Sequence, residues 1–286
     1  MPGLFYDIDH AERALIVLLL KVLKTGFMKT GLVLSGGGYR GIAHIGVLKA
    51  LEEADIVPDV IAGTSAGAAI GALYAQGIPT EKMLSFIKTL ELLSFGNLAF
   101  GKPGWVDPDN FHDAFSELLP EDDFGALRIP MKVTATNILT GKLKVFEEGP
   151  LIRPLLASAA FPGVFAPVEI GEGYYVDGGV LNNFPVDLLR DETDYLIGVY
   201  VNPFEQIDRK AVRHSVHVLE RVLKIKTATD SIRKFELCDL LIYPRELRKY
   251  NTFLEKELDT IFQLGYEEAC RQIEAASGLI PGSGKT

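Results

Sequence analysis

The residue best placed for chemistry is Ser65, at the centre of Gly63-Thr-Ser-Ala-Gly67. The spacing G-x-S-x-G is typical of a serine on a sharp turn from a strand to a helix, where the exposed hydroxyl can attack a carbonyl carbon. Here it follows the apolar run Val60-Ile-Ala62 and precedes a run of small residues. Because Gly63 and Gly67 permit the turn, the sequence predicts a nucleophile elbow centred on Ser65.

A serine nucleophile needs a base, and the sequence offers two kinds. The hydrolase order of serine, acid and histidine is met by Ser65, Asp177 and either His214 or His217. These two histidines lie three residues apart in a charged, predicted helical segment, where a solvated histidine is the commoner arrangement. Asp177 itself, in Asp177-Gly-Gly179, is the other candidate. An aspartate of ordinary pKa, ~3.9, is a weak base, so direct proton transfer requires that Asp177 be buried.

A second glycine cluster, Gly36-Gly-Gly-Tyr-Arg-Gly41, lies between a predicted strand and a predicted helix. It matches the dinucleotide-binding pattern G-x-G-x-x-G. That interpretation requires an acidic residue at the end of the next strand, where the sequence has Gly63 and Thr64. Nucleotide binding is therefore disfavoured.

The same cluster is also suited to binding a developing negative charge. Consecutive backbone N–H groups at a helix N-terminus attract anions, so Gly37 and Gly38 would form an oxyanion hole. Arg40, two residues further on, could bind an anionic group such as a phosphate, although a lone arginine is more often in a surface ion pair.

The elements around these motifs alternate between strand and helix, which predicts a mostly parallel sheet. Apolar runs and helical spacing predict strands at 32–34, 60–62, 131–136, 143–146, 168–170, 174–176, 195–201 and 240–243, and helices at 42–54, 66–76, 80–93, 108–119, from about 206, and 255–275. No break in composition divides the chain. We therefore expect one α/β domain, residues 29–275, with an N-terminal helical extension, residues 1–28, and a flexible tail, residues 276–286.

Composition narrows the function classes. The 286 residues carry 29 Lys and Arg against 38 Asp and Glu, a formal net charge of −9, which argues against non-specific binding of nucleic acid. Cys238 and Cys270 form no C-x-x-C pair, so a zinc ribbon and a disulfide scaffold are excluded. We expect a cytoplasmic protein whose lipid contacts, if any, rest on apolar residues and local lysines.

Two apolar segments are candidates for such contacts. The run Ala14–Leu20 is shorter than the ~20 residues of a membrane-spanning helix, and it predicts a helix that packs on the domain or lies in a membrane interface. The aromatic residues within Phe95–Trp105 predict a lid, a membrane-touching loop or a loop tucked onto the core.

Three motifs in this order, Ser35–Gly41, Gly63–Gly67 and Asp177–Gly179, resemble the patatin-like phospholipase family, particularly its bacterial members. Ser65 and Asp177 are 112 residues apart, which suits that family. The stretch Ala157–Gly163 resembles the one before the family's aspartate, and the similarity extends from about Lys29 to Ala275.

The resemblance implies a three-layer α/β/α sandwich with a mostly parallel central sheet, related to the α/β hydrolases. It implies that members cleave acyl esters of glycerolipids without calcium or another cofactor. The implied site consists of a Ser–Asp dyad, an oxyanion loop in which the first glycine shapes the loop and the next two donate, and a phosphate-binding arginine: Ser65, Asp177, Gly36, Gly37, Gly38 and Arg40.

We therefore expect a serine lipid acyl hydrolase acting on a glycerolipid or phospholipid, with possible peripheral contact with a membrane. The alternatives are a non-catalytic lipid-binding or regulatory protein on the same fold, and an acyltransferase that uses the same acyl-enzyme. The sequence leaves the headgroup, the acyl chain and the oligomeric state open.

Overall fold

The computed structural model describes residues 28–94, 106–209, 212–213, 215–250 and 257–276. The predicted N-terminal extension, the Phe95–Trp105 segment and the predicted tail fall, apart from Met28 and Ala276, outside these residues.

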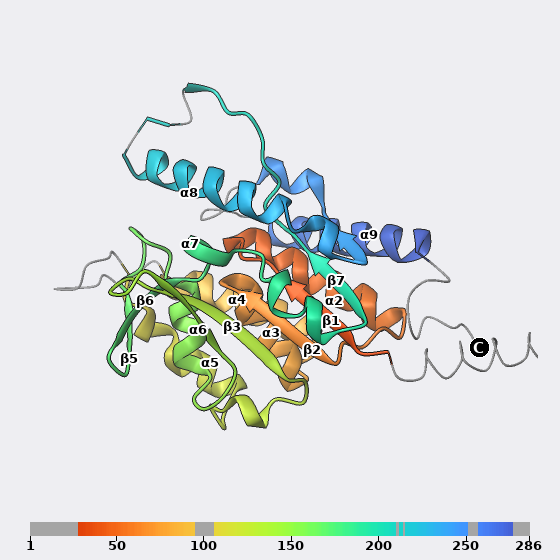
Figure 1. Cartoon of the computed structure of the whole chain (residues 1–286), viewed down its shortest axis with the longest axis horizontal. Helices are drawn as coiled ribbons and strands as arrows, with labels where there is room; N and C mark the ends of the chain where they lie inside the picture. The colour runs from red at the N-terminus through yellow and green to blue at the C-terminus, as the bar shows by residue number, and fades with distance from the viewer. Residues whose placement is uncertain (1–27, 95–105, 210–211, 214, 251–256, 277–286) are drawn as a thin grey trace, which may run out of the picture.

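The strands form one mixed, mostly parallel sheet in the described part of the chain (Figure 1). They run β1 Thr30–Leu34, β2 Val60–Thr64, β3 Met131–Asn137, β4 Lys142–Phe146, β5 Val168–Ile170, β6 Gly173–Asp177, β7 Tyr195–Val199 and β8 Leu240–Ile242. Their order is β5-β6-β3-β2-β1-β7-β8, with β4 also paired to β3. The β1, β2, β3, β7 and β8 pairings are parallel, whereas β4, β5 and β6 join in antiparallel pairs.

Helices cover the sheet on both sides. They are α2 Ile42–Glu53, α3 Ala66–Gln76, α4 Thr80–Ser94, α5 His112–Leu118, α6 Ile152–Ala159, α7 Gly179–Asn182, α8 Ser215–Ile232 and α9 Leu258–Ala275. Figure 1 shows α7 and α8 on the upper side of the sheet, while α5 and α6 lie below it. None of the helices in the described residues combines the length and the apolarity needed to cross a bilayer.

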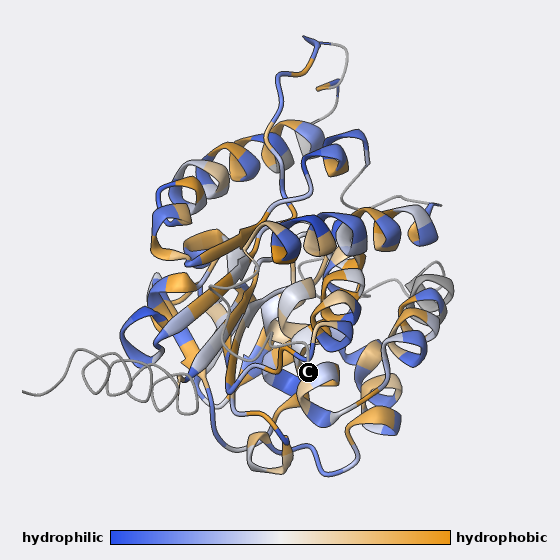
Figure 2. Ribbon diagram, turned by 90° about the vertical axis from the view of Figure 1, so that its right-hand side faces the viewer, coloured by the Kyte–Doolittle hydropathy of each residue, from blue (hydrophilic) through white to orange (hydrophobic). Residues whose placement is uncertain are grey.

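The core lies on both faces of the sheet because successive strand residues point to opposite faces. In β1, Leu32 and Leu34 belong to the larger apolar cluster with α2, α3 and α6, and Val33 belongs to a second cluster with Phe184 and Tyr200. All residues of β1, β2 and β7 are buried. Figure 2 shows the surrounding helices with alternating hydrophobic and hydrophilic segments, as expected for helices with one buried side.

The α/β class with a mostly parallel sheet is confirmed. Every predicted strand is present, with ends that shift by a few residues. Two short helices, α6 and α7, were not predicted from the sequence. The long helix expected from about Gln206 is α8, which begins at Ser215. Residues 202–208 are not helical.

Candidate active site

Ser65 occupies the turn between β2 and α3 in an unusual backbone conformation. Its φ is +55° and its ψ is −125°, a region that side chains rarely adopt and that is typical of strained functional turns. The turn brings α3 close to the end of β1, since a Cβ at Gly67 would lie 2.3 Å from the carbonyl oxygen of Leu34. Only glycine fits there, which gives a physical reason for the last position of the motif.

Asp177 lies directly beside the serine. It ends β6, which pairs with β3, and its Oδ2 accepts a hydrogen bond from Ser65 Oγ at 2.7 Å. Its Oδ1 accepts the backbone N–H of Gly179 at 2.7 Å. No imidazole stands between Ser65 and Asp177. The two predicted catalytic residues are thus brought together from β2 and β6.

Burial changes the acid–base properties of this carboxyl group. Asp177 is 5% exposed, and its desolvation raises its pKa from 3.8 to about 6, against the opposing effects of the Ser65 and Gly179 hydrogen bonds. A pKa near 6 leaves the group ionised at neutral pH while making it a stronger base than an exposed aspartate. Proton transfer from Ser65 Oγ to Asp177 Oδ2 is therefore chemically reasonable.

Helix α6 holds both members of the pair. Ser158, fully buried, accepts the backbone N–H of Ser65 on its Oγ at 2.8 Å. Its carbonyl oxygen accepts the N–H of Gly178 at 3.4 Å, and the carbonyl of Ala160 accepts the N–H of Asp177 at 2.9 Å. One short segment thus fixes the backbone on both sides of the Ser65–Asp177 hydrogen bond.

The glycine loop follows β1 and lies, like Ser65 after β2, at the carboxyl ends of the parallel strands. The N–H of Gly36 donates to the carbonyl of Asn183 at 3.0 Å, so it is not available to a substrate. Gly38 has a φ of +56°, which favours glycine. Within the described residues, the N–H groups of Gly37 and Gly38 have no hydrogen-bond acceptor. The N–H groups of Gly37 and Gly38 are therefore free to donate, and the oxyanion hole formed by this loop stays a prediction.

His44, on α2, supports this loop from below. Its Nε2 lies 2.8 Å from the carbonyl oxygen of Ser35, and it must carry the proton because a carbonyl only accepts. The ring is fully buried, and desolvation lowers the pKa of His44 to about 4. His44 is therefore neutral at physiological pH and orients the peptide that leads into Gly36.

Arg40 is engaged with the protein itself. Its side chain is buried, and Nε and Nη2 donate to the carbonyl oxygen of Tyr250 at 2.8 and 2.6 Å. This fork ties the glycine loop to the segment after β8. Contact between Arg40 and a substrate phosphate stays a prediction.

Asn183 is a site neighbour that sequence reasoning did not single out. A Cβ on Gly36 would lie 2.5 Å from Asn183 Oδ1 and 3.1 Å from Ser65 Cβ, so the amide and the nucleophile flank the same glycine. Its side chain is half-buried. The only available signal was its position in Val180-Leu-Asn-Asn-Phe-Pro185, directly after the Asp-Gly-Gly turn.

The histidines proposed as alternative bases lie elsewhere. His217 is exposed on α8, and His214 lies outside the described residues. Among the residues that the structure describes, no group of three His, Cys, Asp or Glu side chains is arranged to hold a metal ion.

Comparison with known proteins identifies the family. The model of the patatin-like phospholipase family matches residues 32–190. An uncharacterised NTE family protein of Mycobacterium tuberculosis is 34% identical over 192 residues, which cover 65% of this chain and 52% of that protein. The human patatin-like phospholipase domain-containing protein 6 is 27% identical over 272 residues, covering 82% of this chain and 20% of that protein. The chain belongs to the patatin-like phospholipase family.

A solved structure supports the same fold. The crystal structure of VipD from Legionella pneumophila superimposes with a TM-score of 0.59 at 15% sequence identity, covering 87% of this chain and 67% of that chain. At this identity the likeness concerns the fold alone. The chain spans about half the length of the mycobacterial relatives it matches.

Proposed function

We propose that the protein is a serine lipid acyl hydrolase of the phospholipase A, lysophospholipase or esterase type, in which Ser65 and Asp177 form a catalytic dyad. The observation that carries the proposal is the 2.7 Å hydrogen bond from Ser65 Oγ to a buried carboxylate. A serine paired with a base of raised pKa at the start of a helix is the arrangement that nucleophilic catalysis requires.

The reaction has two covalent steps. Asp177 accepts the hydroxyl proton as Ser65 Oγ attacks the ester carbonyl carbon, and the N–H groups of Gly37 and Gly38 stabilise the oxyanion. The positive end of the α3 dipole lies at the same point. Collapse of the tetrahedral intermediate expels the alcohol, which takes the proton from Asp177. The carboxylate then deprotonates a water molecule that attacks the acyl carbon, and Asp177 returns this proton to Ser65 Oγ as the bond to the acyl group breaks and the fatty acid is released.

Replacement of the nucleophile tests the proposal. Ser65→Ala should lower the hydrolysis of a short-chain p-nitrophenyl ester by more than about 1,000-fold, because a step that needs the nucleophile is lost. Ser85→Ala, a change of an exposed serine on α4, is the matched control and should keep full activity. A panel of phospholipids and lysophospholipids, followed by fatty-acid release, identifies the substrate class. Turnover by Ser65→Ala equal to that of the wild type would exclude the dyad.

Two alternatives remain distinguishable. A non-catalytic lipid-binding protein would not be labelled at Ser65 by a fluorophosphonate, because an unactivated serine does not react. A hydrolase and an acyltransferase would form the same acyl-enzyme and differ only in the acceptor. An acyltransferase would pass the acyl group to an added alcohol in preference to water. For the hydrolase and for the acyltransferase alike, we expect peripheral contact with a lipid surface.

A further inference from the structure

Helix α8 exposes a row of large apolar side chains. Val218, Leu219, Val222, Ile225 and Ile232 are between 44% and 56% exposed, and we call these five residues the α8 face. Four of them, Val218, Val222, Ile225 and Ile232, lie at i, i+4, i+7 and i+14 and so share one side of the helix. Contiguous exposed apolar side chains of this kind mark an interaction surface.

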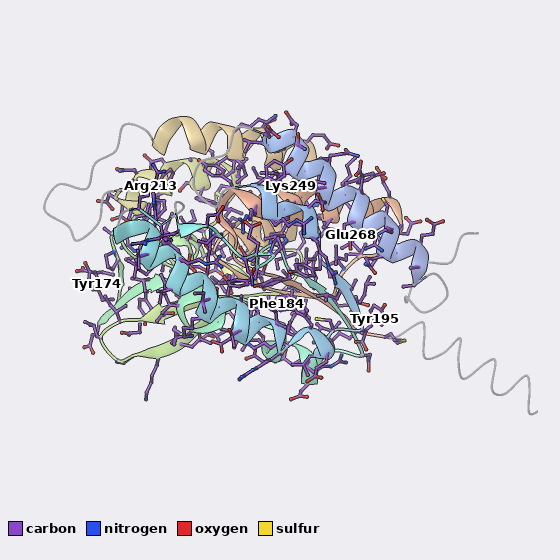
Figure 3. The ribbon with its side chains drawn as sticks, turned by 90° about the horizontal axis from the view of Figure 1, so that it is seen from above. Tyr174, Phe184, Tyr195, Arg213, Lys249 and Glu268 are labelled. Atoms are coloured by element: carbon purple, nitrogen blue, oxygen red, sulfur yellow. The ribbon has the colours of Figure 1, made fainter. Side chains whose placement is uncertain are left out.

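The other side of α8 packs on the domain. Ser231 is 1% exposed and lies about 180° around the helix from Val222, while Ala228, 5% exposed, lies between the two sides. The α8 face is therefore directed away from the core. Figure 1 shows α8 at the periphery of the molecule, across α7, and Figure 3 looks down on it from above, with its beginning near Arg213.

The segment that contains α8 is rich in basic residues. Residues 209–234 contain eight Lys or Arg and two Asp or Glu, a formal net charge of +6, within a chain whose net charge is −9. Arg233 is exposed just beyond Ile232, and the side chain of Lys226, 47% exposed, forms an ion pair with Asp230 at 3.0 Å. An apolar stripe flanked by Lys and Arg is the pattern of a helix that lies in the interface of an anionic membrane.

The α8 face is next to the segments that carry the candidate active site. Lys226 Nζ donates to the carbonyl of Val180 at 2.9 Å, in α7, which directly follows Asp177 and Gly178. Leu219 Cδ2 lies 3.4 Å from the position of a Cβ on Gly163, five residues after Ser158. A surface that binds α8 would therefore lie beside the elements that position Ser65 and Asp177.

We propose that the α8 face is a docking surface for an anionic phospholipid bilayer. The charge decides between a bilayer and a second copy of the chain. A symmetric dimer through α8 would place two segments of charge +6 against each other, whereas anionic headgroups attract them. The inference rests on the proposed function, because a lipid substrate is the reason for the protein to contact a bilayer. Binding to lipid can nevertheless be measured without catalysis.

The test uses the full chain with Ser65→Ala, so that vesicles stay intact during the measurement. Its sedimentation with vesicles of phosphatidylglycerol and phosphatidylcholine is compared with that of the same protein carrying Val222→Asp and Ile225→Asp. The matched control carries Ile138→Asp and Leu139→Asp, a second pair of exposed apolar residues far from α8 in sequence. We expect the α8 changes to weaken the partition coefficient at least about 10-fold and the control to leave it unchanged.

The other outcomes overturn the inference. Equal binding of the α8 variant and the control excludes the α8 face as the lipid contact. A concentration-dependent dimer of the unchanged protein that the α8 changes dissociate would identify a second copy as the occupant. The same α8 changes in the otherwise unchanged enzyme should keep hydrolysis of a soluble short-chain ester. That assay tests the proposed function separately, because its failure in the unchanged enzyme would reject the hydrolase and not the docking surface.

Discussion

At the scale of single residues, the chemistry depends on where one carboxylate is buried. An exposed aspartate would hold a proton too weakly to activate a serine hydroxyl. The site surrounds Asp177 with protein, so desolvation raises its pKa to about 6, while the bonds from Ser65 and Gly179 keep the ionised form accessible. The cost of this arrangement is a buried negative charge.

That cost gives a stability prediction with a definite sign. The folded pKa of about 6 lies above the ordinary 3.8, so the folded protein is favoured by protonation of Asp177 at low pH and loses that stability as the pH rises through about 6. Asp177→Asn, which carries no charge, should abolish activity yet raise the free energy of unfolding by about 1–3 kcal/mol at pH 8.

Urea denaturation at several pH values measures the difference. The gain of Asp177→Asn over the wild type should shrink as the pH falls below about 6 and approach zero only well below 3.8, where Asp177 is protonated in both states. Asp113→Asn, a change of a fully exposed side chain, is the control. Destabilisation of Asp177→Asn at pH 8 would contradict a raised pKa.

At the scale of elements, the strands and turns that contain the motifs can be predicted from the sequence, whereas the residues that hold these turns in place cannot. Buried parallel strands are continuous apolar runs, so β1 and β2 and the turns after them are visible in the sequence. The support by α6 is not, because Ser158 meets Ser65 across 93 residues and its partner is a backbone N–H that any residue carries. The role of His44 is hidden for the same reason, since its acceptor is a backbone carbonyl.

Removal of the hydrogen bond from Ser65 to Ser158 on α6 should leave the nucleophile less accurately positioned and so lower the catalytic rate. Ser158→Ala leaves the N–H of Ser65 buried without its partner, which costs about 1–3 kcal/mol and relaxes a strained turn. We expect kcat for a soluble ester to fall about 10- to 100-fold while KM changes little, because the defect concerns the reacting atom and not substrate binding. Ser85→Ala is again the control. A rise in KM at constant kcat would place Ser158 in substrate binding instead.

At the scale of the whole molecule, the net charge of −9 conceals an uneven distribution. With residues 209–234 at +6, the remaining residues sum to −15. The overall charge alone argues against adsorption to anionic membranes, and the segment around α8, which the sequence analysis did not single out, is a local exception. A molecule with this polarity should approach an anionic surface with α8 foremost, because the rest of the chain is repelled.

This polarity predicts a specific dependence on salt. Binding of the Ser65→Ala protein to vesicles rich in phosphatidylglycerol should weaken at least about 10-fold between 0.05 and 0.5 M NaCl, because the Debye length falls below the spacing of the charges involved. Binding to pure phosphatidylcholine should change little, since it depends on apolar insertion by the α8 face. Light scattering or co-sedimentation across the salt series measures both. A salt dependence that is the same for the two vesicle types would show that the basic segment does not contact the headgroups, and the orientation with α8 foremost would then be wrong.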